Sequence, residues 1–524
     1  MRRAADIAIA LGPRTDGVQL HRWLYNELRV AILTGRLGAA TRLPSTREFA
    51  KQLGLSRGTV QTVFEQLAAE GYLRGVVGLG SFVSSELPDL KAGTALPPYI
   101  STTQAFLSER DAGARTAASY TALSDRGRLL ARTPFPIEGR TVPALAFRPN
   151  QPDFSAFPFD LWRRIASSCA RSLRPNSFAD GEAKGFEPLR RLIAKHLTVA
   201  RGIISSADNV VIVGSAQQVF DLGARLLLDP GDEAWIEDPG YPGVRLILEA
   251  TGAKVVGVPV DEGGMDVAAG YTLAPNAKLV YVTAGRQAPL GYSLALDRRL
   301  ALLSWAKENG AVIVEDDYDS EYRFEGAPLA ALKSLDYAGQ VIYCGTFSKL
   351  LFPSLRIAYA VLPDSLVEPF TAALSLTCRH ASLFSQAVLH EFIAEGHFGR
   401  HVRRMRLLYA ERARAFRAAV DAHLSGLLYI PPITTGLDTP AFLPPGSNDM
   451  LVSQLAAEAG IESRPLSFYT VRRPVPPGLL LGFAAVSPQE IASGVQTLAS
   501  VLGSLFDGSH GSEVTWGHPS IFEP

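Results

Sequence analysis

The sequence predicts a chain of two domains, a small N-terminal winged helix-turn-helix and a large α/β domain with a mostly parallel sheet. Two observations predict this. Within residues 1–85, three helical patterns are followed by a short hairpin. From Phe154 onward, strand and helix patterns alternate, which is typical of an α/β domain. A length of 524 residues with 47% hydrophobic side chains suits one small and one large core.

The N-terminal segment contains three helical patterns in sequence. Apolar residues recur at helical spacing across Leu20–Leu33. Ser45, with Glu48 three residues later, forms a capping box that opens a short second helix at about Thr46–Leu53. After a turn with one glycine, Ser56 caps a third helix that continues to Leu67.

Two helices joined by a short glycine-containing turn form a helix-turn-helix, whose second helix presents its first residues to the major groove. Here these residues are short and polar and include Ser56, Arg57 and Thr59. Arg57 can donate two hydrogen bonds to guanine. The pattern across Gly71–Val83 predicts a small hairpin that forms a wing. The segment therefore predicts double-stranded DNA as a partner.

The charge of the chain is unevenly distributed. Lys and Arg number 51 and Asp and Glu number 51 in the whole chain. Residues 1–85 contain eleven basic and six acidic side chains, which gives this segment +5 and leaves −5 for the rest. A basic head on a faintly acidic body indicates that only the head binds a polyanion.

The segment between the two domains has a different composition. Prolines punctuate a stretch rich in Ala, Thr, Ser and Arg with little periodicity, which predicts a linker. A short helix around Thr121–Ala131 is expected within it. We predict the following domain boundaries: winged helix 1–85, linker 86–143, α/β domain with a small C-terminal α+β lobe 144–505, and disordered tail 506–524.

The α/β domain contains a lysine in an unusual place. Lys349 follows an apolar strand at Val341–Tyr343 and lies among small and hydroxyl residues. A buried lysine has a lowered pKa and is nucleophilic toward carbonyls. Thr346, Ser348 and Arg356 offer the hydroxyl and guanidinium donors that a phosphate needs. A Schiff-base lysine beside a phosphate site predicts pyridoxal 5'-phosphate (PLP) as cofactor.

Three upstream features complete such a site. A strand at Val312–Val314 ends in acids, one of which can pair with the pyridinium nitrogen of the cofactor. Another strand runs into a helix whose first amides and side chains, at Ser215, Ala216 and Gln217, can hold the phosphate at the positive helix end. Tyr241, in a turn, offers an aromatic face for the ring.

The motifs EDPGYPG, EDDYDSEYRF, GTFSKLLFP and AEGHFGRHVRRMR resemble those of the MocR group of GntR-type regulators, in which a winged helix is fused to a type I fold, PLP-dependent aminotransferase-like domain. The resemblance implies that Lys349 carries the cofactor as a Schiff base. It further implies that Asp316 faces the pyridine nitrogen and that Tyr318 bonds the ring hydroxyl. Because adjacent strand residues face opposite ways, Asp317 remains the alternative to Asp316.

The resemblance also assigns the remaining contacts. Around the cofactor they are ring stacking by Tyr241 and phosphate binding by Ser215, Gln217, Thr346, Ser348 and Arg356. In the winged helix the residues at the DNA are Arg47, Arg57 and Thr59, with Gly78 at the wing tip.

The sequence departs from the aminotransferase pattern at two positions. Leu480 stands where aminotransferases carry the arginine that binds the substrate carboxylate, and Ala288 stands where they carry Asn. Arg286 is a new cation beside Ala288 and a candidate for the ligand acid. The other candidates are Arg464, Arg472 and Arg473, and the sequence does not choose among the four.

The chain is thus predicted to be a PLP-dependent transcriptional regulator that senses a small amine or amino acid, or PLP itself, with weak or absent transaminase activity. The alternative is an active aminotransferase that carries a DNA-binding head. A homodimer in the cytoplasm is expected, because no signal peptide or membrane span is apparent and the three cysteines show no disulfide or metal pattern. No metal site is predicted.

Overall fold

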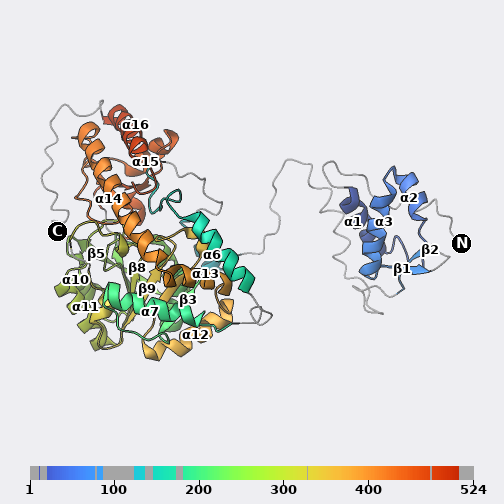
Figure 1. Cartoon of the computed structure of the whole chain (residues 1–524), viewed down its shortest axis with the longest axis horizontal. Coiled ribbons are helices and arrows are strands. Elements are labelled where there is room, and N and C mark those ends of the chain that lie inside the picture. The colour runs from blue at the N-terminus through green and yellow to red at the C-terminus, as the bar shows by residue number, and fades with distance from the viewer. Residues whose placement is uncertain are drawn as a thin grey trace. The chain divides into compact units, whose positions relative to one another are not determined.

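The computed structural model describes residues 11, 20–76, 80–85, 123–135, 146–172, 181–326, 329–472 and 475–506. The chain divides into two compact units, Met1–Thr121 and Ala122–Pro524. Figure 1 shows the helices of the first unit in blue and those of the second from cyan to red.

The first unit is a winged helix-turn-helix, as predicted. Its elements are α1 (Leu20–Leu33), α2 (Thr46–Leu53), α3 (Arg57–Ala69), β1 (Leu73–Val76) and β2 (Gly80–Val83). The two strands pair antiparallel, and the three helices enclose a core that includes Leu24, Leu28, Phe49, Val60 and Leu67.

Both predicted helix caps of this unit are present. The Ser45 hydroxyl accepts the Glu48 amide at 3.2 Å, and the Ser56 hydroxyl accepts the Thr59 amide at 3.0 Å. These bonds fix where α2 and α3 begin, and therefore which side chains stand at the start of the second helix.

The second unit is built on a mostly parallel sheet. Among the described residues this sheet has eight strands in the order β3-β10-β9-β8-β7-β4-β5-β6, with β10 antiparallel to both of its neighbours and β6 antiparallel to β5. The strands are β3 (Val210–Val213), β4 (Glu233–Asp238), β5 (Lys254–Asp261), β6 (Gly264–Met265), β7 (Leu279–Val282), β8 (Val312–Asp317), β9 (Val341–Thr346) and β10 (Ala358–Val361).

Helices connect and cover these strands, and the alternation agrees with the predicted α/β class. They are α5 (Asp125–Leu130), α6 (Phe159–Ser172), α7 (Glu187–Arg201), α8 (Ala216–Leu227), α9 (Pro242–Thr251), α10 (Val267–Leu273), α11 (Leu296–Asn309), α12 (Asp364–Cys378) and α13 (Leu383–Ala394), with 3-10 turns η6 (Ser320–Tyr322), η7 (Leu332–Leu335) and η8 (Pro353–Leu355). The linker helix predicted around Thr121–Ala131 is present as α5.

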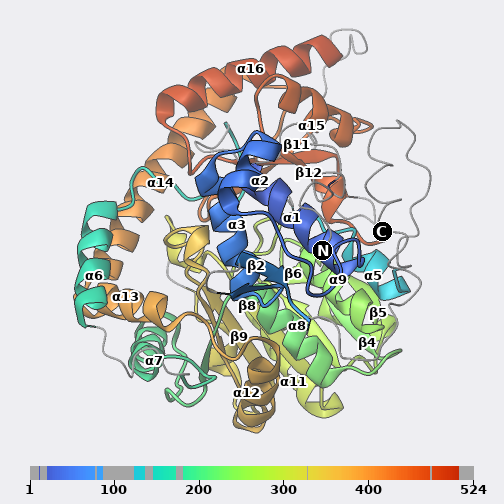
Figure 2. The ribbon, with the colours of Figure 1, turned by 90° about the vertical axis from the view of Figure 1, so that its right-hand side faces the viewer.

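A smaller C-terminal lobe follows. It comprises α14 (His397–His423), β11 (Asp438–Phe442), α15 (Asp449–Glu458), β12 (Arg464–Pro465), η9 (Leu466–Tyr469), β13 (Gly478–Gly482) and α16 (Pro488–Phe506). The strands form a sheet in the order β11-β13-β12, extended by bridges from Ala146 to Ile461 and from Phe147 to Gly482. In Figure 2, α14, α15 and α16 lie together, away from α11 and α12. The lobe therefore also holds Ala146 and Phe147, which precede α6 in the sequence.

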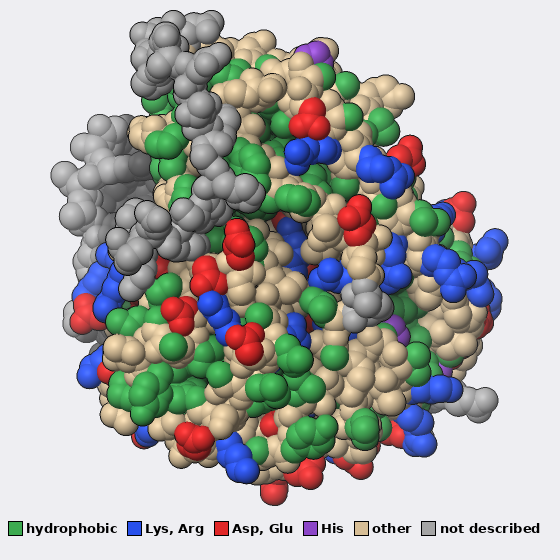
Figure 3. Space-filling view, turned by 90° about the vertical axis from the view of Figure 1, so that its left-hand side faces the viewer, with side chains coloured by type: hydrophobic (Ala, Val, Ile, Leu, Met, Phe, Trp, Pro, Cys, Tyr) green, Lys and Arg blue, Asp and Glu red, His purple; other side chains and the backbone are tan. Residues whose placement is uncertain are grey.

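The surface of the second unit has a mixed charge. On the face drawn in Figure 3, basic and acidic side chains are interspersed. Within the described residues, no helix combines the length and apolar character that crossing a membrane requires.

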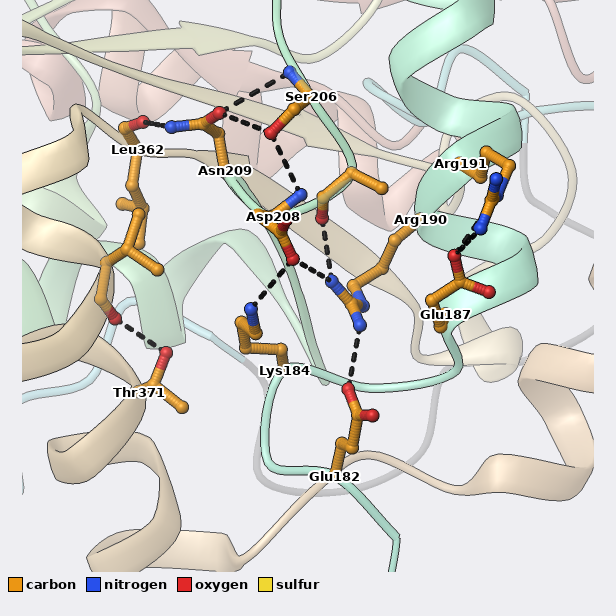
Figure 4. A network of polar contacts seen from close by, with 12 residues as sticks. Glu182, Lys184, Glu187, Arg190, Arg191, Ser206, Asp208, Asn209, Leu362 and Thr371 are labelled. Carbon is orange, nitrogen blue, oxygen red and sulfur yellow. Dashed lines mark hydrogen bonds and ion pairs between the residues drawn. The ribbon is translucent and has the colours of Figure 1, made fainter.

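One buried cation connects α7 to the loops on either side of it. Arg190, 1% exposed, donates to the carbonyls of Gly185 at 3.2 Å and Ala207 at 2.7 Å and to the Glu182 carboxylate at 2.7 Å. Figure 4 shows this guanidinium pointing into the loops, whereas the neighbouring Arg191 pairs with Glu187 along the helix surface. Arg190 therefore fixes the segments that precede and follow α7, and the latter leads into β3.

We expect Arg190→Ala to destabilise the second unit by about 2–4 kcal/mol, because the carbonyls of Gly185 and Ala207 and the Glu182 carboxylate lose the buried donor that they share. The matched control is Arg191→Ala, which removes an exposed helix pair and is expected to cost at most about 0.5 kcal/mol. Urea denaturation of the full-length variants measures both. Equal effects of the two substitutions would contradict the structural role of Arg190.

Candidate functional site

The predicted phosphate-binding groups meet at one edge of the sheet. Strand β10 runs between β3 and β9, so that Ala358 is opposite Val213 on one side and Thr346 on the other. Ser215 lies two residues beyond Val213, and Arg356 lies two residues before Ala358. The pairing therefore gathers groups that are more than 140 residues apart in the sequence.

These groups differ in the hydrogen bonds that they already make within the protein. Ser215 is the N-cap residue of α8, and its side chain makes no capping bond, so the amides at Ala216 and Gln217 begin a helix without a side-chain acceptor. The Thr346 hydroxyl accepts the Ser348 amide at 3.2 Å. Arg356 is exposed and adopts a left-handed backbone conformation (φ 52°) after η8. An anion at this edge would meet a helix N-terminus, hydroxyl groups and a guanidinium.

The end of β8 carries a carboxylate with an unused oxygen. Asp316 is 8% exposed, and its Oδ2 accepts the Tyr281 hydroxyl at 2.7 Å. Its Oδ1 is buried and has no hydrogen-bond partner among the described residues. Burial raises the pKa of Asp316 to about 7, although the Tyr281 hydroxyl opposes the rise. A protonated ring nitrogen is the kind of donor that such an oxygen lacks.

The rival carboxylate, Asp317, is already satisfied. Its Oδ2 accepts the Tyr343 hydroxyl at 2.7 Å and forms an ion pair with Arg201 at 2.5 Å. The two acids thus face different surroundings, as adjacent strand residues do. The geometry favours Asp316 as the acid that faces the cofactor.

Lys349 follows the end of β9, next to β8. Its Nζ donates to the Asn150 carbonyl at 2.8 Å, and the Asn150 amide in turn donates to Asp438 Oδ2 at 2.9 Å. Lys349 is also close enough to Asp316 to oppose the burial-driven rise of that acid's pKa. The amine is therefore bonded to the segment that precedes α6.

Tyr241, at the start of α9, connects to the phosphate side of the site. Its hydroxyl accepts Gln217 Nε2 at 3.2 Å. Its ring packs against Phe135 of the linker, with ring centroids 6.1 Å apart. Burial raises the pKa of Tyr241, Asp316 adds to the rise, and Arg464 opposes it. Tyr241 is thus bonded to the start of α8 and packed against the segment that follows α5.

Tyr318 and Arg286 form a buried polar network. Arg286 Nη1 donates to the Tyr318 hydroxyl and to Asp319 Oδ2, both at 3.1 Å. Arg286 Nη2 donates to the Asp438 carbonyl at 2.6 Å and carboxylate at 2.9 Å. Burial raises the pKa of Asp319 to about 7, and Arg286 opposes this rise. With two carboxylates bound, Arg286 is a poor candidate for a third carboxylate from a ligand.

The two departures from the aminotransferase pattern have clear locations. Ala288 lies in the loop after β7, and its amide donates to the Thr283 hydroxyl at 3.2 Å. Leu480 is 1% exposed and packs in an apolar cluster with Leu290 and Tyr469. Position 480, at which the resemblance implies an arginine in the aminotransferases, is therefore occupied by a buried apolar side chain.

The predicted DNA-contacting residues that the structure describes lie in the first turns of α2 and α3. Ser56 and Arg57 are exposed and Thr59 is half-buried at the start of α3, and Arg47 is exposed on α2. Gly78, the predicted wing tip, lies outside the described residues.

Two polar contacts of the site were missed by sequence reasoning. Tyr281 stands alone among Leu and Val in β7, and a buried hydroxyl in an apolar strand needs a partner, which was a usable signal. The carbonyl of Asn150 gave no signal, because the chain path that brings it to Lys349 depends on a left-handed backbone at Asn150 (φ 58°).

The residues present fit PLP. The unpartnered Asp316 Oδ1 can accept from the ring nitrogen, a lysine amine lies beside it, and the open helix N-terminus with Ser215 can accept a phosphate. Among the described residues, no group of three or more His, Cys, Asp or Glu side chains is placed to hold a metal ion.

Comparison with known proteins agrees with both halves of this description. Residues 20–83 match the family model of bacterial regulatory proteins of the gntR family, and residues 160–498 match aminotransferase class I and II. The chain is 38% identical over 493 residues to "Probable rhizopine catabolism regulatory protein MocR" of Rhizobium meliloti, covering 94% of this chain and 95% of the relative. It is 29% identical to "HTH-type pyridoxine biosynthesis transcriptional regulator PdxR" of Corynebacterium glutamicum, covering 92% and 95%.

The fold comparison concerns the second domain. A kynurenine aminotransferase of Pyrococcus horikoshii superposes with a TM-score of 0.64 at 27% identity and covers 69% of this chain and 91% of its own. Type I fold aminotransferases depend on PLP, which is therefore the cofactor of this fold. With both domains matched along nearly its full length, this chain belongs to the MocR group of GntR-type transcriptional regulators, in which a winged-helix DNA-binding domain precedes an aminotransferase-like domain.

Proposed function

We propose that this protein is a transcriptional regulator whose aminotransferase-like domain binds PLP and senses a small amine or amino acid, and whose winged helix binds DNA in response. One observation carries the proposal. The second domain keeps the groups for holding PLP but has Leu480 in place of the carboxylate arginine, and it is joined to a DNA-binding domain. A domain that binds an amine without the usual carboxylate anchor at position 480, which orients a substrate for turnover, is suited to sensing.

Each group at the site has a role in this proposal. When bound, PLP supplies an aldehyde that condenses with primary amines and a ring that withdraws electrons. Lys349 would attach the cofactor, and the Asp316 carboxylate would accept a hydrogen bond from its protonated ring nitrogen. Tyr318 bonds the ring hydroxyl and Tyr241 stacks on the ring. The phosphate is held by Ser215, Ala216, Gln217, Thr346, Ser348 and Arg356.

The winged helix supplies the output. Arg57 stands exposed at the start of α3, where a recognition helix meets base edges, and Arg47, Ser56 and Thr59 accompany it. We propose that two copies of the chain read two half-sites as a homodimer, because helix-turn-helix proteins commonly bind DNA in this way. For such a DNA-binding role we propose that the protein acts in the cytoplasm.

Two alternatives have specific support. The relative from Corynebacterium glutamicum is named for pyridoxine biosynthesis, which favours PLP itself as the effector. The 27% identity to a kynurenine aminotransferase favours an active enzyme that carries a DNA-binding head. A change in DNA affinity caused by PLP alone would indicate the first, and steady turnover with common amino donors would indicate the second.

We expect Lys349→Ala to remove the visible absorption band of the purified protein while the fold is retained, because no other amine is predicted to attach the cofactor. Absorption spectra and circular dichroism measure the two properties. The control is Lys278→Ala, whose exposed amine pairs with Asp232, and it should keep the band. A band that survives in the Lys349 variant would move the attachment to another residue.

We expect Arg57→Ala to cost about 1–3 kcal/mol of binding to specific DNA and to relax the choice of base at one position, if Arg57 contacts a base edge. Binding titrations on the native operator and on single-base variants test this. An arginine that contacts only phosphate would weaken all sequences alike and would reduce the salt slope by about one.

We expect an amine effector to change the visible spectrum and the DNA affinity together, while keto-acid product forms slowly or not at all, because transamination requires a substrate whose α-proton is oriented. A panel of amino acids is assayed for spectrum, DNA binding and turnover. Turnover near the ordinary enzyme median of about 10 per second would favour the enzyme alternative.

A further inference from the structure

The geometry points to Arg464 as the residue that binds the carboxylate of the effector, in place of the arginine that is missing at position 480. The effector class is then amino acids rather than simple amines. Arg464 would bind that carboxylate by exchange with the carbonyl of Pro134 at the end of the linker. This inference rests on the proposed function, since it assumes that the effector's amine is recognised at the PLP site.

The sheet register places the guanidinium on the strand beside Leu480. Arg464 in β12 is the direct antiparallel partner of Leu480 in β13. Directly opposed residues of antiparallel strands put their side chains on the same face, with Cβ atoms about 4.5–5.5 Å apart. A long arginine side chain from position 464 therefore starts beside the position from which the aminotransferase arginine extends.

The guanidinium of Arg464 has capacity for an anion. It is half-buried, and none of the described carboxylates forms an ion pair with it. Its Nη1 lies 3.5 Å from the Pro134 carbonyl, at the limit of a hydrogen bond, and its Cζ lies 5.1 Å from the Phe468 ring centroid. A carboxylate would offer two charged acceptors in place of one weak neutral one.

The segment that carries Arg464 is bonded to the turn that carries Tyr241. The Gly240 amide donates to the Tyr469 carbonyl at 2.9 Å, and the amides of Val471 and Arg472 donate to Asp238 at 2.8 and 3.0 Å. These bonds hold β12, η9 and the following loop against the end of β4. A ligand beside the Tyr241 ring is therefore also near Arg464. Burial and Asp316 raise the pKa of Tyr241 and Arg464 opposes this rise, which agrees with that placement.

The other cations are less suited to this role. Arg286 is buried with both of its Nη atoms bound to Asp319 and Asp438. Arg472 lies in the same loop as the Tyr241 contacts, but its side chain is exposed and it is not paired with Leu480 in the sheet. Arg473 lies outside the described residues.

The linker contact supplies a route to the DNA-binding domain. Pro134 and Phe135 bridge the two site residues, with the Pro134 carbonyl at Arg464 and the Phe135 ring at Tyr241. Both belong to the segment that follows α5, which itself packs on α9. A ligand carboxylate at Arg464 would replace the Pro134 carbonyl as the acceptor of the Arg464 hydrogen bond. The end of the linker would then be held less tightly.

The test compares Arg464→Gln and Arg464→Lys with the control Arg472→Gln in the full-length, PLP-loaded protein. The probes are L-amino acids, each paired with the amine that remains after its carboxylate is removed, such as L-alanine with ethylamine. The spectral titration gives a half-saturation concentration for each probe. Hydrogen–deuterium exchange of residues 123–135 is measured with and without the strongest-binding amino acid.

We expect Arg464→Gln to weaken the best amino acids by about 10- to 100-fold and to leave their amines unchanged, because one charge-assisted contact is lost. Arg464→Lys keeps the charge without the planar fork and should weaken them less. Exchange of residues 123–135 should rise with the amino acid in the wild-type protein only.

The inference about Arg464 is overturned if the wild-type protein prefers no amino acid over its amine, or if Arg472→Gln has the larger effect. It is also overturned if Arg464→Gln weakens amino acid and amine equally. A wild-type protein without a visible band after PLP loading would instead contradict the proposed function itself. A normal band in the Arg464 variants shows that they are folded.

Discussion

A continuous chain of buried polar contacts holds the parts of the second domain around Lys349. The lysine amine bonds the carbonyl of Asn150, the amide of Asn150 bonds Asp438, and Arg286 bonds both Asp438 and Asp319. These contacts thus join the segment before α6, the sheet of the C-terminal lobe and the segment that follows β8. Arg286, Asp319 and Asp438 are each at most 5% exposed, so removing one would leave a buried charge without its partner, which is costly. The positions of the lobes relative to Lys349 depend on this chain.

The same chain determines which polar atoms remain available. The contacts with Asp319 and Asp438 occupy both Nη atoms of Arg286. The contacts with Arg201 and Tyr343 occupy Asp317 Oδ2. Among the described residues of this region, Asp316 Oδ1, Asp319 Oδ1 and Arg286 Nε still have no hydrogen-bond partner, and the guanidinium of Arg464 has only a weak acceptor. Because buried polar groups are normally satisfied, atoms left open beside a reactive lysine mark where a ligand supplies the missing partner.

The sequence predicted the elements that local chemistry decides and left open what depends on pairing between distant segments. The helices at Leu20–Leu33 and Thr46–Leu53 have the predicted bounds, because apolar residues at helical spacing and a capping box are local signals. Periodicity did not choose between Asp316 and Asp317, since that choice depends on Arg201 and Tyr343 from other elements. Periodicity also did not predict that Arg464 is paired with Leu480, because the register of a strand is set by the whole sheet. The roles of the individual site residues remain predictions.

The exchange at Arg464 also explains how a small ligand can control a separate domain with modest energy. A ligand shifts a conformational equilibrium only by the difference of its affinity for the two states. A carboxylate that gains a charge-assisted contact at Arg464 while the linker loses a weak one at Pro134 provides about 1–3 kcal/mol. This is the usual size of allosteric coupling, about 5- to 150-fold in affinity. An amine without a carboxylate would occupy the same site and leave Pro134 in place, so the signal would depend on the acid group and not on occupancy alone. A carboxylate anchor at Arg464 in β12, instead of position 480 in β13, thus contacts Pro134 at the end of the linker. Such a contact lets the bound carboxylate act on the segment that leads to the DNA-binding domain.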